Sequence, residues 1–81
     1  MQFEGIKMPK LSDTSDDYKV IRIHAKVGDV VKKGGLFLDV ETDKAATTVS
    51  FYRSGKITEL TVKEGAMVRS DALLGVMDVE E

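Results

Sequence analysis

Few side chains in this sequence of 81 residues could perform chemistry by themselves. There is no cysteine, and His24 is the single histidine, so thiol nucleophiles and thiolate or multi-histidine metal centres are excluded. The serines lack the glycine-flanked turn and the partnered base that a hydrolase nucleophile needs. Asp13, Asp16 and Asp17 lie close together, but they lack the spacing and the glycine of a calcium loop. The sequence therefore predicts no catalytic residue and no metal site.

Lys44 is the remaining candidate, in the polar segment Glu41-Thr42-Asp43-Lys44-Ala45. Strand-like runs at 36–41 and 45–50 flank this segment, so its polar residues should form the tip of a tight hairpin. A lysine offers a primary amine on a long, flexible stem, and an exposed one can be acylated by another enzyme. Taken by themselves, these five residues are also compatible with an ordinary solvated turn.

Composition limits the partners and the size of the protein. The net charge of −2 argues against a nucleic acid partner. The longest nearly apolar stretch, 72–77, is far shorter than the roughly 20 residues of a membrane span. We expect a single domain over 1–81. The N-terminus has neither a signal nor a transit design, so we expect the bacterial cytoplasm or the mitochondrial matrix.

Short β-strands are the elements that would position Lys44. β-Branched residues are frequent, and seven glycines divide the chain into pieces of strand length. No window shows the apolar periodicity of a helix. The sequence therefore predicts an all-β fold with eight strands, near 3–8, 19–25, 30–31, 36–41, 45–50, 56–62, 67–68 and 73–79. We expect Met8, Met67 and Met77 in the core and His24 in a strand at the surface.

An internal repeat predicts how the strands are arranged. When the chain is shifted by 37 residues, segment 20–41 lies on 57–78, and Gly28 falls on Gly65. Neither half could bury its apolar face alone, so two four-stranded sheets should pack as a flattened sandwich or barrel with quasi-two-fold symmetry. Each half breaks strict alternation once, which predicts a bulge in strands 19–25 and 56–62. The symmetry also predicts that both termini lie at one end and the Lys44 tip at the other.

Further motifs accompany Asp43-Lys44-Ala45 at fixed distances. They are Met8-Pro9-Lys10-Leu11-Ser12, Val27-Gly28-Asp29-Val30-Val31 and Val62-Lys63-Glu64-Gly65. As a set, over about residues 3–79, they resemble the lipoyl attachment domain of the dihydrolipoyl acyltransferases of 2-oxo acid dehydrogenase complexes. The resemblance implies that Lys44 carries lipoic acid in amide linkage and that Asp43 and Ala45 are flanking recognition residues.

The same resemblance implies a non-catalytic swinging-arm carrier, monomeric as an isolated domain. A lipoate ligase or lipoyl transferase would modify Lys44. The lipoyl group would shuttle acyl groups and reducing equivalents between a thiamin-diphosphate-dependent 2-oxo acid dehydrogenase, a dihydrolipoyl acyltransferase core and dihydrolipoyl dehydrogenase. The 2-oxo acid, whether pyruvate, 2-oxoglutarate or a branched-chain acid, stays open. The resemblance also places the loop with Asp13, Asp16 and Asp17 near the lysine tip, with a role in dehydrogenase recognition.

Three alternatives stay open: a biotin carboxyl carrier, an unmodified lipoyl-like structural module, and a glycine-cleavage carrier. Biotin-carrier domains typically have methionine on both sides of the modified lysine, and these residues differ from the ones that flank Lys44. Glycine-cleavage carriers are usually longer. Tyr18 and Tyr52 stand where the lipoyl family often has glycine and proline, and we expect both residues in loops that flank strands.

Overall fold

Eight β-strands make up the fold in a computed structural model that describes residues 2–11, 17–42 and 44–80. The strands are β1 (Phe3–Lys7), β2 (Asp17–Ile23), β3 (Val30–Val31), β4 (Leu36–Glu41), β5 (Ala46–Ser50), β6 (Gly55–Leu60), β7 (Met67–Arg69) and β8 (Leu73–Val79). Within the described ranges there is no helix, and therefore none that could span a membrane. The all-β prediction is confirmed, with boundaries displaced by at most two residues.

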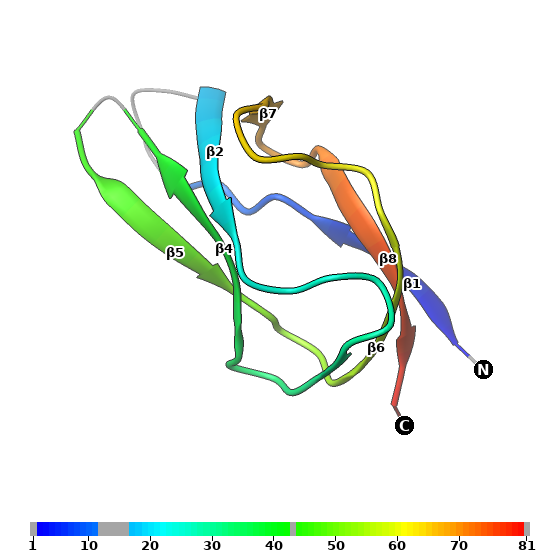
Figure 1. Ribbon diagram of the computed structural model, residues 1–81. Helices are drawn as coiled ribbons and strands as arrows, with labels where there is room; N and C mark the ends of the chain where they lie inside the picture. The colour runs from blue at the N-terminus through cyan, green and yellow to red at the C-terminus, as the bar shows by residue number, and fades with distance from the viewer. Residues whose placement is uncertain (1, 12–16, 43, 81) are drawn as a thin grey trace.

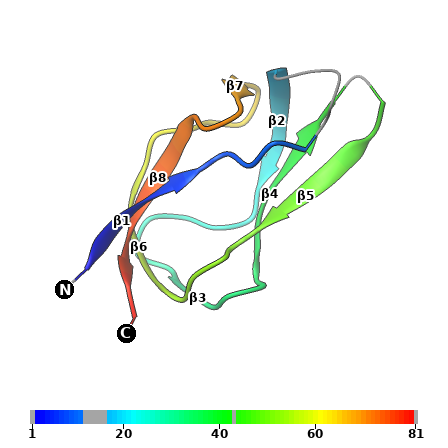
Figure 2. The ribbon, with the colours of Figure 1, turned by 180° about the vertical axis from the view of Figure 1, so that it is seen from behind.

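The strands form two antiparallel sheets of four strands that pack face to face (Figures 1 and 2). One sheet has the order β1-β8-β6-β3, and the other has the order β5-β4-β2-β7. The 37-residue shift carries β2 onto β6 and β4 onto β8, so the two sheet orders correspond strand by strand. The predicted sandwich with quasi-two-fold symmetry is therefore confirmed.

Both predicted bulges are present at equivalent places. The register of β2 against β4 shifts between Val20 and Arg22, and the register of β6 against β8 shifts between Ile57 and Glu59. These positions differ by 37 residues, as the repeat requires. A bulge bends its strand and increases its twist. Each sheet is thus curved by the same device at the same place.

The chain termini and the lysine segment lie at opposite ends of the molecule, which extends 37 Å along its longest axis (Figures 1 and 2). The amide of Val79 donates to the carbonyl of Gln2 at 2.7 Å, which holds the two ends of the chain side by side. At the far end, the amide of Thr42 donates to the carbonyl of Ala45 at 2.9 Å. The predicted positions of the termini and of the tip are confirmed.

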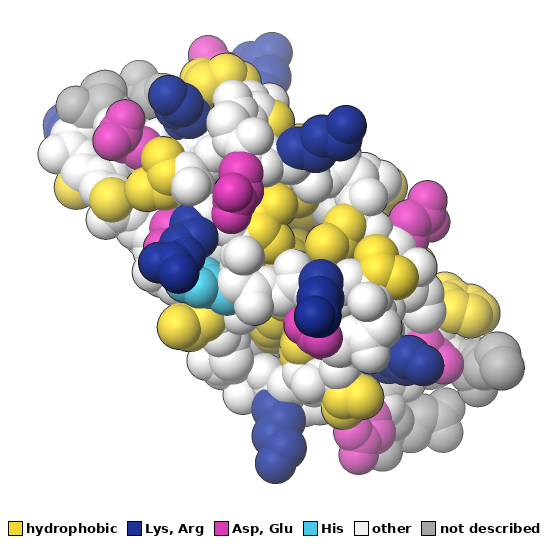
Figure 3. Space-filling view, viewed as in Figure 1, with side chains coloured by type: hydrophobic (Ala, Val, Ile, Leu, Met, Phe, Trp, Pro, Cys, Tyr) yellow, Lys and Arg dark blue, Asp and Glu magenta, His cyan; other side chains and the backbone are white. Residues whose placement is uncertain are grey.

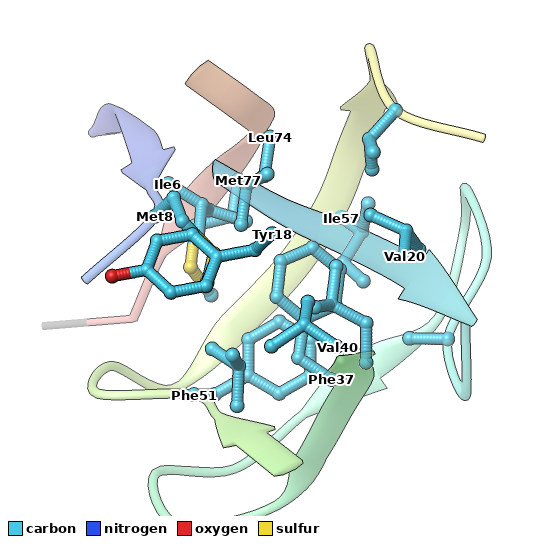
Figure 4. Close-up of a cluster of buried hydrophobic side chains, with 14 of the residues drawn as sticks. Ile6, Met8, Tyr18, Val20, Phe37, Val40, Phe51, Ile57, Leu74 and Met77 are labelled. Carbon is cyan, nitrogen blue, oxygen red and sulfur yellow. The ribbon is translucent and has the colours of Figure 1, made fainter. Parts of the chain in front are cut away.

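The core lies between the two sheets and is apolar among the described residues (Figure 4). Phe37 and Phe51 stack at its centre with ring centroids 4.6 Å apart. Its largest fully buried side chains are Tyr18, Phe37, Met8, Leu38, Ile57, Leu74, Val20 and Val40. Aliphatic and aromatic side chains contributed by both sheets hold the halves together by removing apolar surface from water.

Three predicted placements are wrong: the loop position of Tyr18, the core position of Met67 and the strand position of His24. Tyr18 is not in a loop: it lies in β2 and is fully buried, and its hydroxyl accepts a hydrogen bond from the amide of Leu11 at 2.9 Å. Met67 is not in the core, because it lies on edge strand β7 with 63% of its surface exposed, whereas Met8 and Met77 are buried as expected. His24 is exposed as predicted but follows the end of β2, and Tyr52 lies in a loop as predicted.

Glycine is required in two equivalent turns. Gly28 and Gly65 have φ of 97° and 89°, and the 37-residue shift relates them. The turn after β3 and its equivalent before β8 also have positive φ, at Gly34 and at Asp71. An L-residue with a Cβ is strained in this region.

We predict that Gly28→Ala and Gly65→Ala each lower the free energy of unfolding by about 1–2 kcal/mol. A Cβ at either site would meet no heavy atom within 4 Å, so the cost arises from the backbone. Chemical denaturation measures it. Lys33→Ala, at an exposed turn residue whose own φ is not positive, is the control and should change stability by less than about 0.5 kcal/mol. Losses that differ widely between the two glycines would contradict the equivalence of the turns.

Candidate functional site

Lys44 lies at the tip between β4 and β5, and its side chain is exposed. Within the described part of the chain, its ammonium group makes no hydrogen bond and no ion pair. The amine is therefore presented to solvent by a hairpin that is anchored in a sheet. Ala45 is exposed beside it, and Asp43 lies outside the described residues. The recognition roles of Asp43 and Ala45, and the attachment role of Lys44, stay predictions.

The hydroxyl of Thr42 holds the lysine turn in shape. Its oxygen accepts hydrogen bonds from the amides of Lys44 and Ala45, both at 3.2 Å, and it donates to the carbonyl of Ala45 at 3.0 Å. A threonine side chain that bonds to the following backbone can replace a backbone turn bond. Thr42 was not singled out from the sequence, although a threonine between a strand and a charged turn is a recognised signal for such a motif.

The start of β2 lies at the same end of the molecule as Lys44. Lys19 of β2 stands opposite Glu41 of β4, so Asp17, two residues earlier on the antiparallel strand, is level with the tip. Asp17 also lies 3.6 Å from Arg69 of β7, in an exposed ion pair. The rest of the predicted acidic loop, 12–16, lies outside the described residues.

A polar cluster on the outer face of sheet β5-β4-β2-β7 is centred on Asp39 of β4. One carboxylate oxygen accepts the hydroxyl of Thr48 at 2.7 Å, and the other lies 3.1 Å from Nε2 of His24. Arg22 is the register partner of Asp39 on β2. Figure 3 shows His24 in cyan among basic and acidic side chains. The hydrogen bond from Thr48, followed by the hydrogen bond and charge of His24 and by the charge of Arg22, lowers the pKa of Asp39 below 3.8.

The arrangement suits attachment of a group and does not suit catalysis by the described residues. Among the described residues, no group of three or more His, Cys, Asp or Glu side chains is placed to hold a metal ion. The described residues also enclose no cavity that could hold a substrate. What the structure offers is an exposed primary amine on a hydrogen-bonded turn. The residues present therefore fit a covalently attached group at Lys44.

We predict that Thr42→Val lowers the free energy of unfolding by about 1 kcal/mol, because the amides of Lys44 and Ala45 lose their acceptor. Hydrogen exchange of these two amides should accelerate, as measured by NMR. Thr42→Ser keeps the hydroxyl and should restore slow exchange. Thr47→Val is the matched control, because Thr47 is exposed and its hydroxyl makes no hydrogen bond within the described residues. Equal exchange in Thr42→Val and wild type would contradict this role.

We predict that Thr48→Val raises the pKa of Asp39 toward 3.8, because the bond from Thr48 is the largest cause of its lowering. A carboxyl whose pKa is lower in the folded protein stabilises the fold above its unfolded pKa. That contribution is lost as the pH falls through the lower folded pKa. Thr48→Val should therefore lose less stability than wild type on acidification below about pH 4. NMR titration of Asp39 measures the shift, and an unchanged pKa would assign the lowering to His24 and Arg22.

Similar proteins of known identity share this fold and much of this sequence. Residues 4–77 match the family model described as biotin-requiring enzyme. The chain is 39% identical over 70 residues to the dihydrolipoyllysine-residue succinyltransferase component of the 2-oxoglutarate dehydrogenase complex of Azotobacter vinelandii, which covers 86% of this chain and 18% of that protein. It is 34% identical over 77 residues to the dihydrolipoyllysine-residue acetyltransferase component of the pyruvate dehydrogenase complex of Rhizobium meliloti, covering 94% of this chain and 17% of that protein.

Among solved structures, the solution structure of the lipoyl domain of the 2-oxoglutarate dehydrogenase complex of Azotobacter vinelandii is similar at 36% identity. It superposes with a TM-score of 0.73 over 91% of this chain and 94% of the other. This match covers both chains almost completely, while the chain spans less than a fifth of the acyltransferases it resembles. The chain therefore belongs to the biotinyl/lipoyl attachment family and has the fold of its lipoyl domains.

Proposed function

We propose that Lys44 is the attachment site of a lipoyl group and that the domain serves as the swinging-arm carrier of a 2-oxo acid dehydrogenase complex. One observation carries this proposal: an exposed lysine amine, which makes no hydrogen bond or ion pair with the described residues, stands on a turn held by Thr42, at the far end of a lipoyl-domain fold from the termini. The solvated-turn alternative explains the exposure of Lys44 but does not explain the resemblance of Asp43-Lys44-Ala45 and its accompanying motifs to a lipoyl attachment domain.

Lipoic acid is a better candidate than biotin for this lysine. Asp43 and Ala45 flank Lys44, whereas biotin-carrier domains typically have methionine on both sides of the modified lysine. The structural neighbour that covers almost the whole chain is itself a lipoyl domain. Because the family model includes biotin-dependent proteins, a biotin carboxyl carrier is the second candidate function.

The chain and the attached group would have separate tasks. The lipoyl group would supply a dithiolane that takes up electrons and an acyl group. The chain supplies a rigid starting point, because the Thr42 bonds and strands β4 and β5 fix the backbone on both sides of Lys44. Amide formation removes the charge of the lysine. Tethering would keep the carried group at an effective concentration of roughly millimolar near the partner sites.

The named relatives support a place in a 2-oxo acid dehydrogenase complex. They are components of 2-oxoglutarate and pyruvate dehydrogenase complexes, at similar identities to this chain. The proposed partners are a lipoate ligase or lipoyl transferase, the thiamin-diphosphate-dependent dehydrogenase, the acyltransferase core and dihydrolipoyl dehydrogenase. The 2-oxo acid stays open among pyruvate, 2-oxoglutarate and a branched-chain acid. A location in the bacterial cytoplasm or mitochondrial matrix stays a prediction.

We predict that incubation with lipoate, ATP and lipoate ligase raises the intact mass by one lipoyl group, and that Lys44→Arg abolishes the gain. Arginine keeps the positive charge but offers no acylatable amine under these conditions. Lys56→Arg, an exposed lysine on β6, is the matched control and should be lipoylated like wild type. Peptide mapping should locate the added group on Lys44.

A mass gain that persists in Lys44→Arg would refute attachment at this residue. Incubation with biotin and biotin ligase forms the second arm, with a streptavidin blot as its readout. Biotinylation without lipoylation would favour the carboxyl carrier. A chain that accepts neither group would favour the unmodified structural module.

A further inference from the structure

The free edge of β5 differs from the other three sheet edges. Strand β5 is last in its sheet, and within the described residues it is paired with β4 only. It reads Ala-Thr-Thr-Val-Ser, five residues without charge, glycine or proline. Proteins usually protect exposed edges with charged residues, proline, bulges or very short strands, because an open edge can accept another strand.

Each of the other edges has such a protection. Strands β3 and β7 are only two and three residues long. Strand β1, the symmetry equivalent of β5, contains Glu4, Gly5 and Lys7, whereas the register shifts of β1 against β8 and of β5 against β4 are equivalent and do not distinguish the two edges. Within the described residues, the fold therefore offers two equivalent long edges. The edge far from Lys44 carries charged residues and a glycine, and the edge that begins two residues after Lys44 carries neither.

The backbone groups at this edge can be assigned from the hydrogen-bond pattern. Thr42 and Ala45 form a bonded pair, since the amide of Thr42 donates to the carbonyl of Ala45. Bonded and non-bonded pairs alternate along an antiparallel ladder. Thr47 then faces β4, while Ala46 and Thr48 direct their amides and carbonyls to the open edge. An added strand could pair with these four groups.

The position of the edge indicates which partner would use it. An enzyme that acylates Lys44 must bring its active site to within one lysine side chain, roughly 6 Å, of the backbone. Its own chain must therefore lie against the residues that adjoin Lys44. A partner that acts on the end of the attached lipoyl arm works farther away and does not need this contact.

We infer that the open edge of β5 is the docking site for an extended segment of the lipoylating enzyme, which adds a strand to the sheet beside Lys44. This inference rests on the proposed function. Pairing through Ala46 and Thr48 would supply backbone hydrogen bonds in a fixed register. This register would hold Lys44 at a fixed position relative to the residues of the added strand. Lys44 would thereby be selected over the other exposed lysines by position as well as by its neighbours.

The test compares two proline variants in lipoylation by lipoate ligase at a domain concentration well below KM. Ala46→Pro removes an amide that faces the open edge and leaves the bonds to β4 intact. Phe3→Pro is the control at the equivalent position of β1: Gln2 bonds to Val79, so the amide of Phe3 also faces outward, far from Lys44. We expect Ala46→Pro to lower kcat/KM roughly three- to tenfold and Phe3→Pro to leave it unchanged.

Amide exchange provides a second measurement that needs no variant of the strand. In the Lys44→Gln domain mixed with the ligase, exchange at Ala46 and Thr48 should slow at least severalfold, while exchange at Phe3 should not change. Protection at both amides would support the inference even if Ala46→Pro fails to fold. Unprotected amides would overturn it, as would an unchanged kcat/KM of a folded Ala46→Pro domain.

The remaining outcomes distinguish failure of the proposed function from failure of the docking inference. A wild-type chain that the ligase does not modify overturns the proposed function and this inference with it. A wild-type chain that is modified as fast as Ala46→Pro overturns the inference only. If Ala46→Pro is lipoylated normally but is a poorer substrate of the 2-oxo acid dehydrogenase, the edge serves that enzyme, and the inference is wrong.

Discussion

The fold depends on a reciprocal exchange of backbone hydrogen bonds between its two halves. The amide of Gly28, in the first half, donates to the carbonyl of Ile57 at 2.8 Å, and the amide of Gly65, in the second half, donates to the carbonyl of Val20 at 2.7 Å. Return bonds follow from Ile57 to Asp29 and from Val20 to Ala66. Each turn is thus bonded to a strand of the other half of the chain, at the bulge of that strand, so neither half can form its native turn without the other.

This exchange of hydrogen bonds holds the body of the molecule together, and the tip around Lys44 lies outside it. Among the described residues, the buried side chains are apolar and the ion pairs lie at the surface, as does the cluster around Asp39. Surface ion pairs contribute little stability. Stability therefore resides mainly in the sheets and the core, while the tip around Lys44 is fixed by a few local bonds from Thr42. Attachment of a group to Lys44 would disturb none of the packed side chains.

Much of the fold was predictable because it repeats. The shared spacing of Gly28 and Gly65 revealed two halves, and from them followed the sandwich, the bulges and the opposed positions of Lys44 and the termini. Side-chain roles were less predictable. Met67 is apolar yet exposed, as is Val30 at the equivalent place, because both lie on short edge strands. Tyr18 is buried because its hydroxyl reaches the amide of Leu11, a contact that no local pattern reveals. The role of Thr42 depends on the geometry of a single turn.

The placement of the two ends has a mechanical consequence. The quasi-two-fold relates the bond between Thr42 and Ala45 at the lysine turn to the bond between Val79 and Gln2 at the termini. A tether joined to either end of the chain would thus leave the body at nearly the same point, opposite Lys44. The body then acts as a stiff rod between tether and lysine, and its length of up to 37 Å adds to the radius that the lysine can sweep. An arm attached to Lys44 would therefore start at the outer limit of the volume that the tethered domain can reach.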